Sequence, residues 1–247
     1  MDYGKPVVLI LEDDVDLADE LGYAIQRSGY DPVLCKDVAS FWSHVARREV
    51  DIIIADIGLP DGYGVDVVRE VRSQSDVPII ITSGHTDIED RVAGIEVGAD
   101  DYLAKPYNLR EVTAKLSRLL TRTKGTKYSK KLGSLKGQDR LMFEGFELRL
   151  DSMALTSPEG EDIPLTTYEF LLLKTLAERP KSVLSRSSLI DLVHQESWFG
   201  SERTVDNLVS RIRTKLAKFS NASIIKTVRG MGYVFTADTS RKDTEGG

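Results

Sequence analysis

Residues 52–64 read IIIADIGLPDGYG, a run of isoleucines that ends in an acid and is followed by a glycine-rich turn. A short unbroken run of β-branched residues is typical of a parallel strand that is buried on both faces. Val7–Leu11 and Ile79–Ile81 are similar runs, and Val33–Cys35 and Asp101–Leu103 are weaker ones. The N-terminal half therefore predicts a five-stranded parallel sheet.

Helical patterns lie between these strands. Apolar residues recur at a spacing of three or four within residues 17–25, 41–45, 65–71, 88–95 and 109–119. Strand and helix that alternate five times predict a doubly wound α/β fold with right-handed crossovers. In such a fold, ligands bind beyond the carboxyl ends of the strands.

Charged and hydroxyl side chains follow four of the predicted strands: Glu12, Asp13, Asp14, Asp56, Thr82, Ser83 and Lys105. The topology brings them to one edge of the sheet. Clustered carboxylates repel one another unless a cation lies among them, and such oxygen ligands suit Mg²⁺. A carboxylate can also accept a phosphoryl group as a nucleophile, with a lysine stabilising the added charge. Taken alone, Asp13 and Asp14 would equally fit as caps of a helix that begins near Val15.

The composition, with 41% hydrophobic and 29% charged residues, is ordinary for a folded soluble protein and argues against a disordered or fibrous chain. No stretch approaches the roughly 18 apolar residues of a membrane span. The first apolar run ends in acids, whereas a signal peptide would end in small residues at a cleavage site. The single cysteine, Cys35, excludes a disulfide framework or a thiolate metal cluster. We therefore expect a cytoplasmic protein without a membrane partner.

The charge is unevenly distributed along the chain. Residues 1–120 carry 12 Lys and Arg against 23 Asp and Glu, a net charge of −11, whereas residues 121–247 carry 21 against 16, a net charge of +5. This asymmetry makes the basic half a candidate for binding nucleic acid and the acidic half a candidate for holding cations. Two solvated surfaces of unlike composition are the simpler alternative.

Four segments of the first 120 residues, LILEDD, IIIADIGLPDGYG, PIIITSGH and GADDYLAKPYNLREV, together resemble the receiver domain of two-component response regulators, a flavodoxin-like fold. The resemblance implies that Asp56 is the phosphoacceptor. It also implies a set of Mg²⁺ ligands, namely Glu12, Asp13, Asp56 and the backbone carbonyl of Gly58. The matching switch residues are Ser83, which stands five residues after Pro78, Lys105 and Tyr102.

The resemblance also implies a mechanism. A sensor histidine kinase presents a phosphohistidine, and the receiver catalyses transfer to its own Asp56 by positioning and electrostatics. Ser83 and Lys105 then bind the phosphoryl group, and the inward movement of Ser83 lets Tyr102 rotate inward. In the Lys-Pro motif, the peptide bond after Lys105 is often cis in this family. Tyr107 stands where Phe is common.

A face formed by the last helix, strand and helix of this half is expected to pair with a second copy after phosphorylation. Its charged residues include Arg91, Asp100, Asp101, Glu111 and Lys115. We predict ion pairs of Arg91 with Glu111 and of Asp101 with Lys115 between the two copies. Such exposed pairs contribute only about 0–1 kcal/mol each, and Lys115 stands where Arg is common, so a bidentate contact is lost.

The next segment, residues 121–140, reads TRTKGTKYSKKLGSLKGQDR and lacks an apolar stripe. Its Lys, Ser and Gly content predicts a flexible basic tether. We therefore expect a receiver domain over residues 1–121, a linker over 122–138, a second domain over 139–238 and a disordered tail over 239–247.

The second domain has a mixed α+β pattern. Residues 143–150 and 153–156 predict short antiparallel strands, and Thr166 to Glu169 predict a capping box ahead of a helix. A second helix is expected over roughly Ser187 to Gln195. A third follows Ser201, and its apolar residues Val205, Leu208, Val209, Ile212 and Leu216 form one stripe. Two β-prone runs around a glycine-rich turn then predict a hairpin with Arg229 at its tip.

A polar face of the third helix carries Thr204, Asn207, Arg211 and Lys215 at a spacing of three or four. A helix with one buried stripe and one face that bears Arg and Asn fits a reader of the DNA major groove. The segments LTTYEFLLLKTLAERP, LSRSSLID, RTVDNLVSRIRTKL and KTVRGMGYVF together resemble the winged-helix DNA-binding domain of the OmpR/PhoB family. The resemblance makes this helix the recognition helix and the hairpin the wing.

The expected DNA contacts follow from the match. Arg211 is the preferred base reader, and phosphate or minor-groove contacts are assigned to Arg203, Thr204, Thr227 and Arg229. Asn207, Arg213 and Lys215 complete the predicted DNA-binding set. The loop from His194 to Ser201, with Trp198 and Phe199, is the one that often meets RNA polymerase in this family, and packing against the helices is the alternative for these aromatic residues.

The sequence as a whole thus predicts a transcriptional response regulator that is phosphorylated on Asp56, dimerises and binds double-stranded promoter DNA. Two alternatives remain. The first is a Mg²⁺-dependent phosphatase with an aspartyl nucleophile, although Gly58 stands where such enzymes carry a second acid. The second is a regulator that binds DNA constitutively. Apart from catalysing its own phosphorylation and dephosphorylation, the chain is not expected to be an enzyme.

Overall fold

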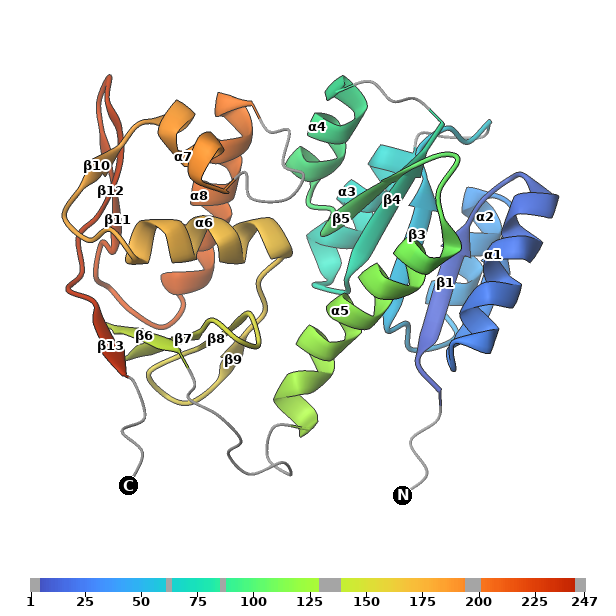
Figure 1. Cartoon of the computed structure of the whole chain (residues 1–247), viewed down its shortest axis with the longest axis horizontal. Helices are drawn as coiled ribbons and strands as arrows, with labels where there is room; N and C mark the ends of the chain where they lie inside the picture. The colour runs from blue at the N-terminus through green and yellow to red at the C-terminus, as the bar shows by residue number, and fades with distance from the viewer. Residues whose placement is uncertain (1–4, 61–63, 85–87, 129–138, 194–200, 243–247) are drawn as a thin grey trace. The chain divides into compact units, whose positions relative to one another are not determined.

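The computed structural model of the chain describes residues 5–60, 64–84, 88–128, 139–193 and 201–242, without the side chains of residues 88–91, 121–128 and 242. The chain divides into two compact units, residues 1–121 and 122–247. Each unit is described by itself below, with the element labels of Figure 1.

The first unit is the predicted doubly wound α/β fold. Its strands are β1 (Val7–Leu11), β2 (Asp31–Cys35), β3 (Ile52–Asp56), β4 (Ile79–Ser83) and β5 (Asp101–Ala104). They form a parallel sheet in the order β2-β1-β3-β4-β5. The helices are α1 (Val15–Arg27), α2 (Val38–Val45), α3 (Gly64–Gln74), α4 (Ile88–Val97) and α5 (Leu109–Tyr128). The fold class predicted from the sequence is confirmed.

Two apolar cores enclose this sheet because alternate residues of each strand point to opposite faces. Val8 and Ile10 of β1 belong to the core under α1 and α5, whereas Leu9 and Leu11 belong to the core under α2 and α3. Both faces are covered, which explains why these strands read as continuous apolar runs. The polar strand ends are therefore the part of the sheet that remains available for chemistry.

Helix α5 extends beyond the predicted boundary of the linker, so the expectation of a flexible tether from residue 122 is wrong for residues 122–128. The helix is anchored by buried residues on its first three turns, among them Val112, Leu116 and Leu119. Once a helix is nucleated, each added residue needs only one more hydrogen bond, and Lys and Arg are good helix formers. The helix can therefore continue to Tyr128 without an apolar stripe in this segment. The remainder of the linker lies outside the described residues.

The second unit combines three helices of its described part with two antiparallel sheets. The helices are α6 (Thr167–Ala177), α7 (Arg186–Val193) and α8 (Glu202–Leu216). One sheet has the order β13-β6-β7-β8-β9, with β6 (Arg140–Phe143), β7 (Phe146–Arg149), β8 (Ala154–Thr156), β9 (Asp162–Ile163) and β13 (Ser240–Lys242). The other has the order β10-β12-β11, with β10 (Val183–Leu184), β11 (Ile225–Val228) and β12 (Gly232–Phe235).

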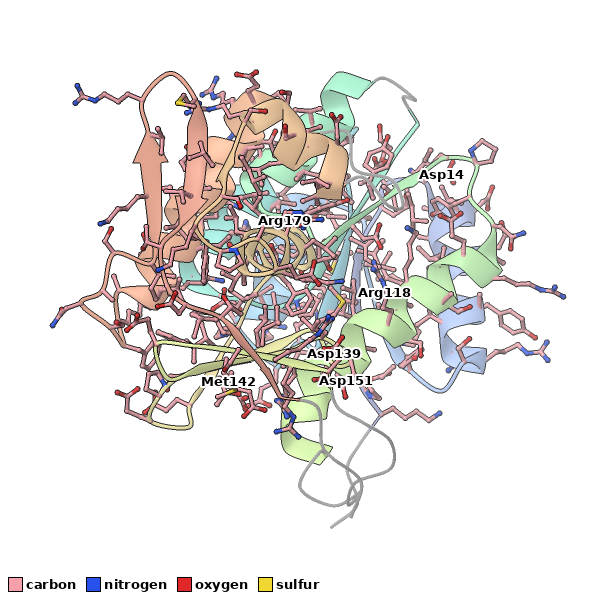
Figure 2. All side chains as sticks on the ribbon, turned by 60° about the vertical axis from the view of Figure 1, so that its left-hand side comes forward. Asp14, Arg118, Asp139, Met142, Asp151 and Arg179 are labelled. Atoms are coloured by element: carbon pink, nitrogen blue, oxygen red, sulfur yellow. The ribbon has the colours of Figure 1, made fainter. Side chains whose placement is uncertain are left out.

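Two predictions for this unit need correction. The strand expected over 143–150 is divided by a turn, because Glu144 and Gly145 both adopt positive φ angles of 46° and 82°. The tail is not disordered from residue 239, since β13 pairs antiparallel with β6. Arg241 reaches both carboxylate oxygens of Asp139, at 2.6 and 2.7 Å, beside the strand that contains Met142 (Figure 2). That bidentate pair and the strand pairing fix a segment whose composition alone predicted disorder.

The two sheets of this unit share an aromatic core. The ring of Phe143 in β6 meets that of Phe235 in β12 edge to face, with 5.1 Å between centroids, and stacks on Phe146 at 5.4 Å. Capping boxes start two of the helices: Thr166 caps α6 together with Glu169, and Ser201 caps α8. The Phe143–Phe235 contact thus holds β12 of the hairpin against β6 of the other sheet.

Gly232, at the start of β12, is predicted to be essential for the hairpin. A Cβ atom there would lie 2.0 Å from the Leu184 carbonyl oxygen of β10, and φ is 143°. We expect Gly232→Ala to lower the free energy of unfolding by at least about 3 kcal/mol. Gly230→Ala is the matched control, because φ is also positive there but nothing lies within 4 Å; it should cost roughly 1–2 kcal/mol. Equal losses in urea unfolding would contradict the role of the close approach.

Candidate functional site

A buried ion-pair cluster lies at the carboxyl ends of β1, β3 and β5. The Lys105 ammonium is 2.7 Å from Oδ2 of Asp56 and 2.6 and 2.7 Å from the two carboxylate oxygens of Glu12. Glu12 and Asp56 are almost fully buried, at 3% and 6% exposure. Two neighbouring carboxylates removed from water need a counter-charge, and the lysine supplies it. The prediction from topology that these three side chains meet is therefore reproduced by the structure.

Backbone contacts fix the phosphoacceptor candidate, Asp56. The Gly58 amide donates to its Oδ1 at 3.0 Å. A Cβ atom on Gly64, the first residue of α3, would lie 1.9 Å from the Asp56 carbonyl oxygen, so the start of α3 packs directly on this backbone. On the neighbouring strand, Ser83 is buried, and its carbonyl accepts from the Lys105 amide at 2.7 Å. The Lys105–Pro106 peptide bond is cis.

Burial and charge act together on the pKa values of this cluster. It raises the pKa of Glu12, and the hydrogen bond and charge of Lys105 offset only part of that increase. Burial by itself lowers the pKa of Lys105, but the hydrogen bonds and charges of Asp56 and Glu12 together shift it upward. The lysine therefore stays cationic, and any further positive charge or hydrogen-bond donor would favour the ionised form of Glu12.

The acids of the cluster fit a divalent cation. Glu12, Asp13 and Asp56 each offer an oxygen, and these oxygens all lie within 4.8 Å of one another. Three carboxylate ligands with one exposed member, Asp13, suit Mg²⁺, which retains several waters. Asp14 is excluded from this set because its side chain caps α1 by accepting from the Leu17 amide at 3.1 Å (Figure 2). Within the acidic run, Asp13 thus fits the metal site and Asp14 is the helix cap.

The residues on the outward face of α8 are shifted along the helix by about one residue from the predicted face. Arg203, Ser210 and Thr214 are exposed, and Asn207 and Arg211 are half-buried. The spacing of these five residues is helical, and the apolar stripe that includes Val205 and Leu208 lies on the opposite side, fully buried. The outward stripe is polar and carries few charges, which suits contacts with base edges in a groove.

Two predicted DNA contacts on this helix are wrong. Thr204 is completely buried, because the third position of a capping box turns its side chain back toward the cap, where the Ser201 amide donates to its hydroxyl at 3.0 Å. Lys215 is turned toward the start of α6, where its ammonium reaches Glu169 at 3.0 Å and the Pro164 carbonyl at 2.6 Å. Both side chains are used to build the domain.

A network around Tyr233 joins the hairpin to the helices. The Tyr233 hydroxyl donates to Asp206 of α8 at 2.5 Å, and Arg186 of α7 donates to the same carboxylate at 2.7 Å. The guanidinium groups of Arg186 and Arg213 lie over the Tyr233 ring at 5.1 and 5.5 Å. Burial and the Asp206 hydrogen bond raise the pKa of Tyr233, so the phenol remains the donor. The predicted wing and recognition helix therefore form one unit.

Comparison with known proteins agrees with both halves of this description. The family model "Response regulator receiver domain" matches residues 8–117, and "Transcriptional regulatory protein, C terminal" matches residues 160–235. Sensory transduction protein RegX3 of Mycolicibacterium smegmatis is 35% identical over 228 residues, covering 92% of this chain and 97% of its own length. This chain belongs to the OmpR/PhoB family of two-component response regulators.

Other relatives have the same extent. Aerobic respiration control protein ArcA of Escherichia coli is 32% identical over 238 residues, covering 94% of this chain and 98% of its own length. A solved structure of a RitR mutant has a TM-score of 0.55 at 24% identity, covers 94% of this chain and 99% of that chain, and shows the fold alone. The response regulator described here is thus a transcriptional regulator with a receiver and a DNA-binding domain, and not a conventional enzyme.

The charged face expected to form the dimer of this response regulator is partly used within the domain. Asp100 is buried and bonded to Arg72 at 2.6 Å and to the Ile79 amide at 3.0 Å, so its assignment to a dimer surface is wrong. Asp101 pairs with Lys115 of its own protomer at 2.8 Å, whereas the prediction placed this pair between two copies.

The rest of that face is more open. Arg118, also bound to Asp101, and Glu111 have side chains that are about half exposed, at 48% and 53%. Lys115 also lies 3.6 Å from Glu111. The side chain of Arg91 lies outside the described residues.

Other predicted residues of the response regulator are placed as follows. Tyr102, predicted to be the switch aromatic, is buried in the core that includes Ile81 and Ala99. Thr227 and Arg229 of the wing are exposed, and Arg213 donates to the Thr227 hydroxyl at 3.0 Å. The loop over residues 194–200, with Trp198 and Phe199, lies outside the described residues. None of the helices in the described part is both long and apolar enough to cross a bilayer.

Sequence reasoning missed Ser210 and Thr214 on the outward stripe, and Arg186 and Asp206 of the Tyr233 network. Counting in steps of three and four from Arg203 would have found the first two. The network had no such signal, because it joins three segments that are distant in the chain.

The charge balance at the receiver site generates a stability prediction for the metal-free protein. Lys105→Met leaves Glu12 and Asp56 buried without their cation, so we expect a loss of about 2–4 kcal/mol in the free energy of unfolding at pH 7. Because the pKa of Glu12 is raised, protonation of Glu12 contributes favourably to the free energy of unfolding below its ordinary pKa of 4.5. This contribution is lost as the pH rises through the raised pKa.

In Lys105→Met, the favourable contribution of protonated Glu12 persists to higher pH. The loss in the free energy of unfolding should therefore be smaller at pH 5 than at pH 7. Urea unfolding in a chelator at both pH values measures this, with the exposed Lys5→Met as control. An equal loss in the free energy of unfolding at both pH values would contradict the explanation by buried carboxylates.

Proposed function

We propose that this response regulator is switched by phosphorylation of Asp56. The observation that supports the proposal is the Lys105 ammonium placed between Asp56 and Glu12 at the strand ends. The donor would be a phosphohistidine of a sensor histidine kinase. The Asp56 carboxylate attacks phosphorus, the bond from phosphorus to the histidine nitrogen breaks, and an aspartyl phosphate results.

The chain's own residues would contribute most of the positioning. Gly58 holds one oxygen of Asp56, which leaves the oxygen near Lys105 at the side where the added charge develops. Lys105 would stabilise that charge, and the Ser83 hydroxyl would bind a phosphoryl oxygen. Glu12, Asp13, Asp56 and the Gly58 carbonyl would hold Mg²⁺, which when bound neutralises charge on the phosphoryl group. The same groups would support slow dephosphorylation of Asp56.

The switch would pass from Ser83 to Tyr102 and then to the dimer face. In the structure Tyr102 already occupies an inward position, so phosphorylation would stabilise this position relative to an outward one. The homodimer would form through the α4, β5 and α5 face, where Arg91, Glu111 and Lys115 remain the proposed contacts. Asp101 would contribute there mainly by holding Lys115.

The DNA-binding domain would read double-stranded promoter DNA in the cytoplasm. We assign base reading to Arg211 with Asn207, and backbone or minor-groove contacts to Arg203, Thr227 and Arg229. Arg213 would position the wing, since its guanidinium bonds to the Ile225 carbonyl at 3.0 Å and to Thr227. RNA polymerase is a further proposed partner through residues 194–200. Two DNA-binding modules brought together by the dimer raise each other's effective concentration at a promoter.

Phosphorylation at Asp56 is tested by acetyl phosphate and Mg²⁺. We expect mass spectrometry of the intact chain to show one added phosphoryl group in the wild type and none in Asp56→Asn, because the amide is not a nucleophile. Asp66→Asn is the matched control, since Asp66 is an exposed acid of α3 whose side chain pairs with Arg69 of the same helix. Equal labelling of wild type and Asp56→Asn would place the acceptor elsewhere.

The division of roles on DNA is tested with two arginine variants. Arg211→Ala should relax base preference at one position of the site and cost about 1–3 kcal/mol there. Arg229→Ala should weaken binding to all sequences and reduce the salt slope by about 1. Competition binding over a panel of single-base site variants at several salt concentrations measures both. If the two substitutions weaken every site equally, the proposed division of roles is wrong.

A further inference from the structure

The hydroxyl of Thr82, in β4, is buried and has no hydrogen-bond partner among the residues that the structure describes. The residue as a whole is 1% exposed. A hydroxyl that is removed from water without a partner destabilises a fold, whereas a valine of nearly the same shape would not. An unsatisfied polar group in a buried strand therefore calls for an explanation, and a functional site is one place where such groups are kept.

Thr82 lies beside the phosphoacceptor candidate in the sheet. It is the register partner of Asp56 in the neighbouring strand β3, and its carbonyl accepts from the Ile57 amide at 3.1 Å. Ile54 and Ile80, two residues earlier in these strands, belong to the same apolar core. Since residues two apart in a strand point to the same face, the side chains of Asp56 and Thr82 share one face, on strands about 4.8 Å apart.

The side chain of Lys105 reaches across the strand of Thr82. In the sheet, β4 lies between β3 and β5, and Thr82 is paired with Asp56 on one side and with Leu103 on the other. Lys105 follows β5, yet its ammonium lies 2.7 Å from Asp56 of β3, so it has to cross β4. The hydroxyl of Thr82 is thus enclosed between the strands that lead to the two members of this ion pair.

In the unphosphorylated protein, both side-chain oxygens of Asp56 already have donors. Oδ1 accepts from the Gly58 amide at 3.0 Å, and Oδ2 accepts from Lys105 at 2.7 Å. Under the proposed function, one Asp56 oxygen forms a bond to phosphorus while the bond from phosphorus to the histidine nitrogen breaks, and Lys105 turns toward the phosphoryl oxygens. The remaining acyl oxygen of Asp56 has two acceptor sites, and the Gly58 amide fills only one.

We propose that Thr82 is a positioning residue of the phosphorylation site, whose hydroxyl donates to the acyl oxygen of phosphorylated Asp56 once Lys105 has turned to the phosphoryl group. The inference rests on the proposed phosphorylation of Asp56. The hydroxyl is unsatisfied before phosphorylation and satisfied after it, so it favours the phosphorylated form by destabilising the other one. Ser83 binds the phosphoryl group itself, so the two adjacent hydroxyls have different partners.

The test is a titration of the full chain with trifluoroberyllate in the presence of Mg²⁺, followed by calorimetry. This probe binds an aspartate oxygen in the geometry of a phosphoryl group. We expect Thr82→Val to weaken its binding roughly three- to tenfold, the range of one hydrogen bond, and Thr82→Ser to restore the affinity to within about twofold. Thr113→Val is the matched control and should leave the affinity unchanged, because the Thr113 hydroxyl is bonded within α5, to the Arg110 carbonyl at 3.1 Å.

Urea unfolding without the probe separates this role from a purely structural one. Thr82→Val should be at least as stable as the wild type, because it removes an unsatisfied hydroxyl. A residue that only supports the fold would instead lose stability and probe affinity together, and that result would contradict the proposal. Titration with Mg²⁺ alone should give the same affinity for Thr82→Val and the wild type; a loss equal to that seen with the probe would place the effect at the metal site and overturn the proposal.

The outcomes for the wild type and the variant distinguish this inference from the proposed function. Equal affinity of the wild type and Thr82→Val for trifluoroberyllate would overturn the inference and leave phosphorylation of Asp56 intact. A wild type that neither binds the probe nor accepts a phosphoryl group from acetyl phosphate would overturn the proposed function itself.

A measurement in the unchanged protein keeps the inference testable if Thr82→Val does not fold. The hydroxyl proton of Thr82 should move downfield in the NMR spectrum and exchange more slowly with water when trifluoroberyllate binds, because it enters a hydrogen bond. The hydroxyl proton of Thr113 should change in neither respect. A Thr82 hydroxyl proton with the same shift and exchange rate in both states would overturn the proposal.

Discussion

The receiver domain depends on one electrostatic constraint: two carboxylates, Glu12 and Asp56, are buried side by side at the ends of adjacent strands, and the Lys105 ammonium lies within 2.7 Å of both. The apolar cores on both faces of the sheet leave the strand ends as the place where such charges can collect. Without a cation the pair would repel and lose hydration. The fold thus carries a charge imbalance that a divalent ion or a phosphoryl group can change, which is what a switch requires.

The sequence predicted this cluster well because its information is local. Each strand ends where an apolar run stops, and parallel topology alone brings the following residues together. Residue type alone could not separate Asp13 from Asp14, since both fit a helix cap; the resemblance to receiver domains assigned Asp13 to the metal site, and the structure shows that Asp14 is the cap. Nor could it show that Asp100 binds Arg72 while Asp101 binds Lys115, because both acids are buried and only the packing around β5 decides which partner each one meets.

The DNA-binding domain shows where such reasoning fails. A polar residue on a helix was assigned to the outer face by its type, yet Thr204 completes a capping box and Lys215 bonds to the start of α6. Similarly, the C-terminal strand β13 has a composition typical of disorder and is held by pairing with a strand about one hundred residues earlier. In each case the deciding partner is distant in the chain, and its position follows only from the tertiary fold.

The Tyr233 network bears on how the proposed phosphorylation would control transcription. Tyr233, Arg186, Asp206 and Arg213 hold the wing against α7 and α8, and the contact of Phe143 with Phe235 holds it against the sheet that contains β6. A reading surface that is already rigid has little conformational cost left to remove on DNA binding. Under the proposed function, phosphorylation of the receiver would therefore gain little by reshaping this surface. It would gain most by bringing two such surfaces together in a dimer, because a second tethered module raises affinity without any new contact.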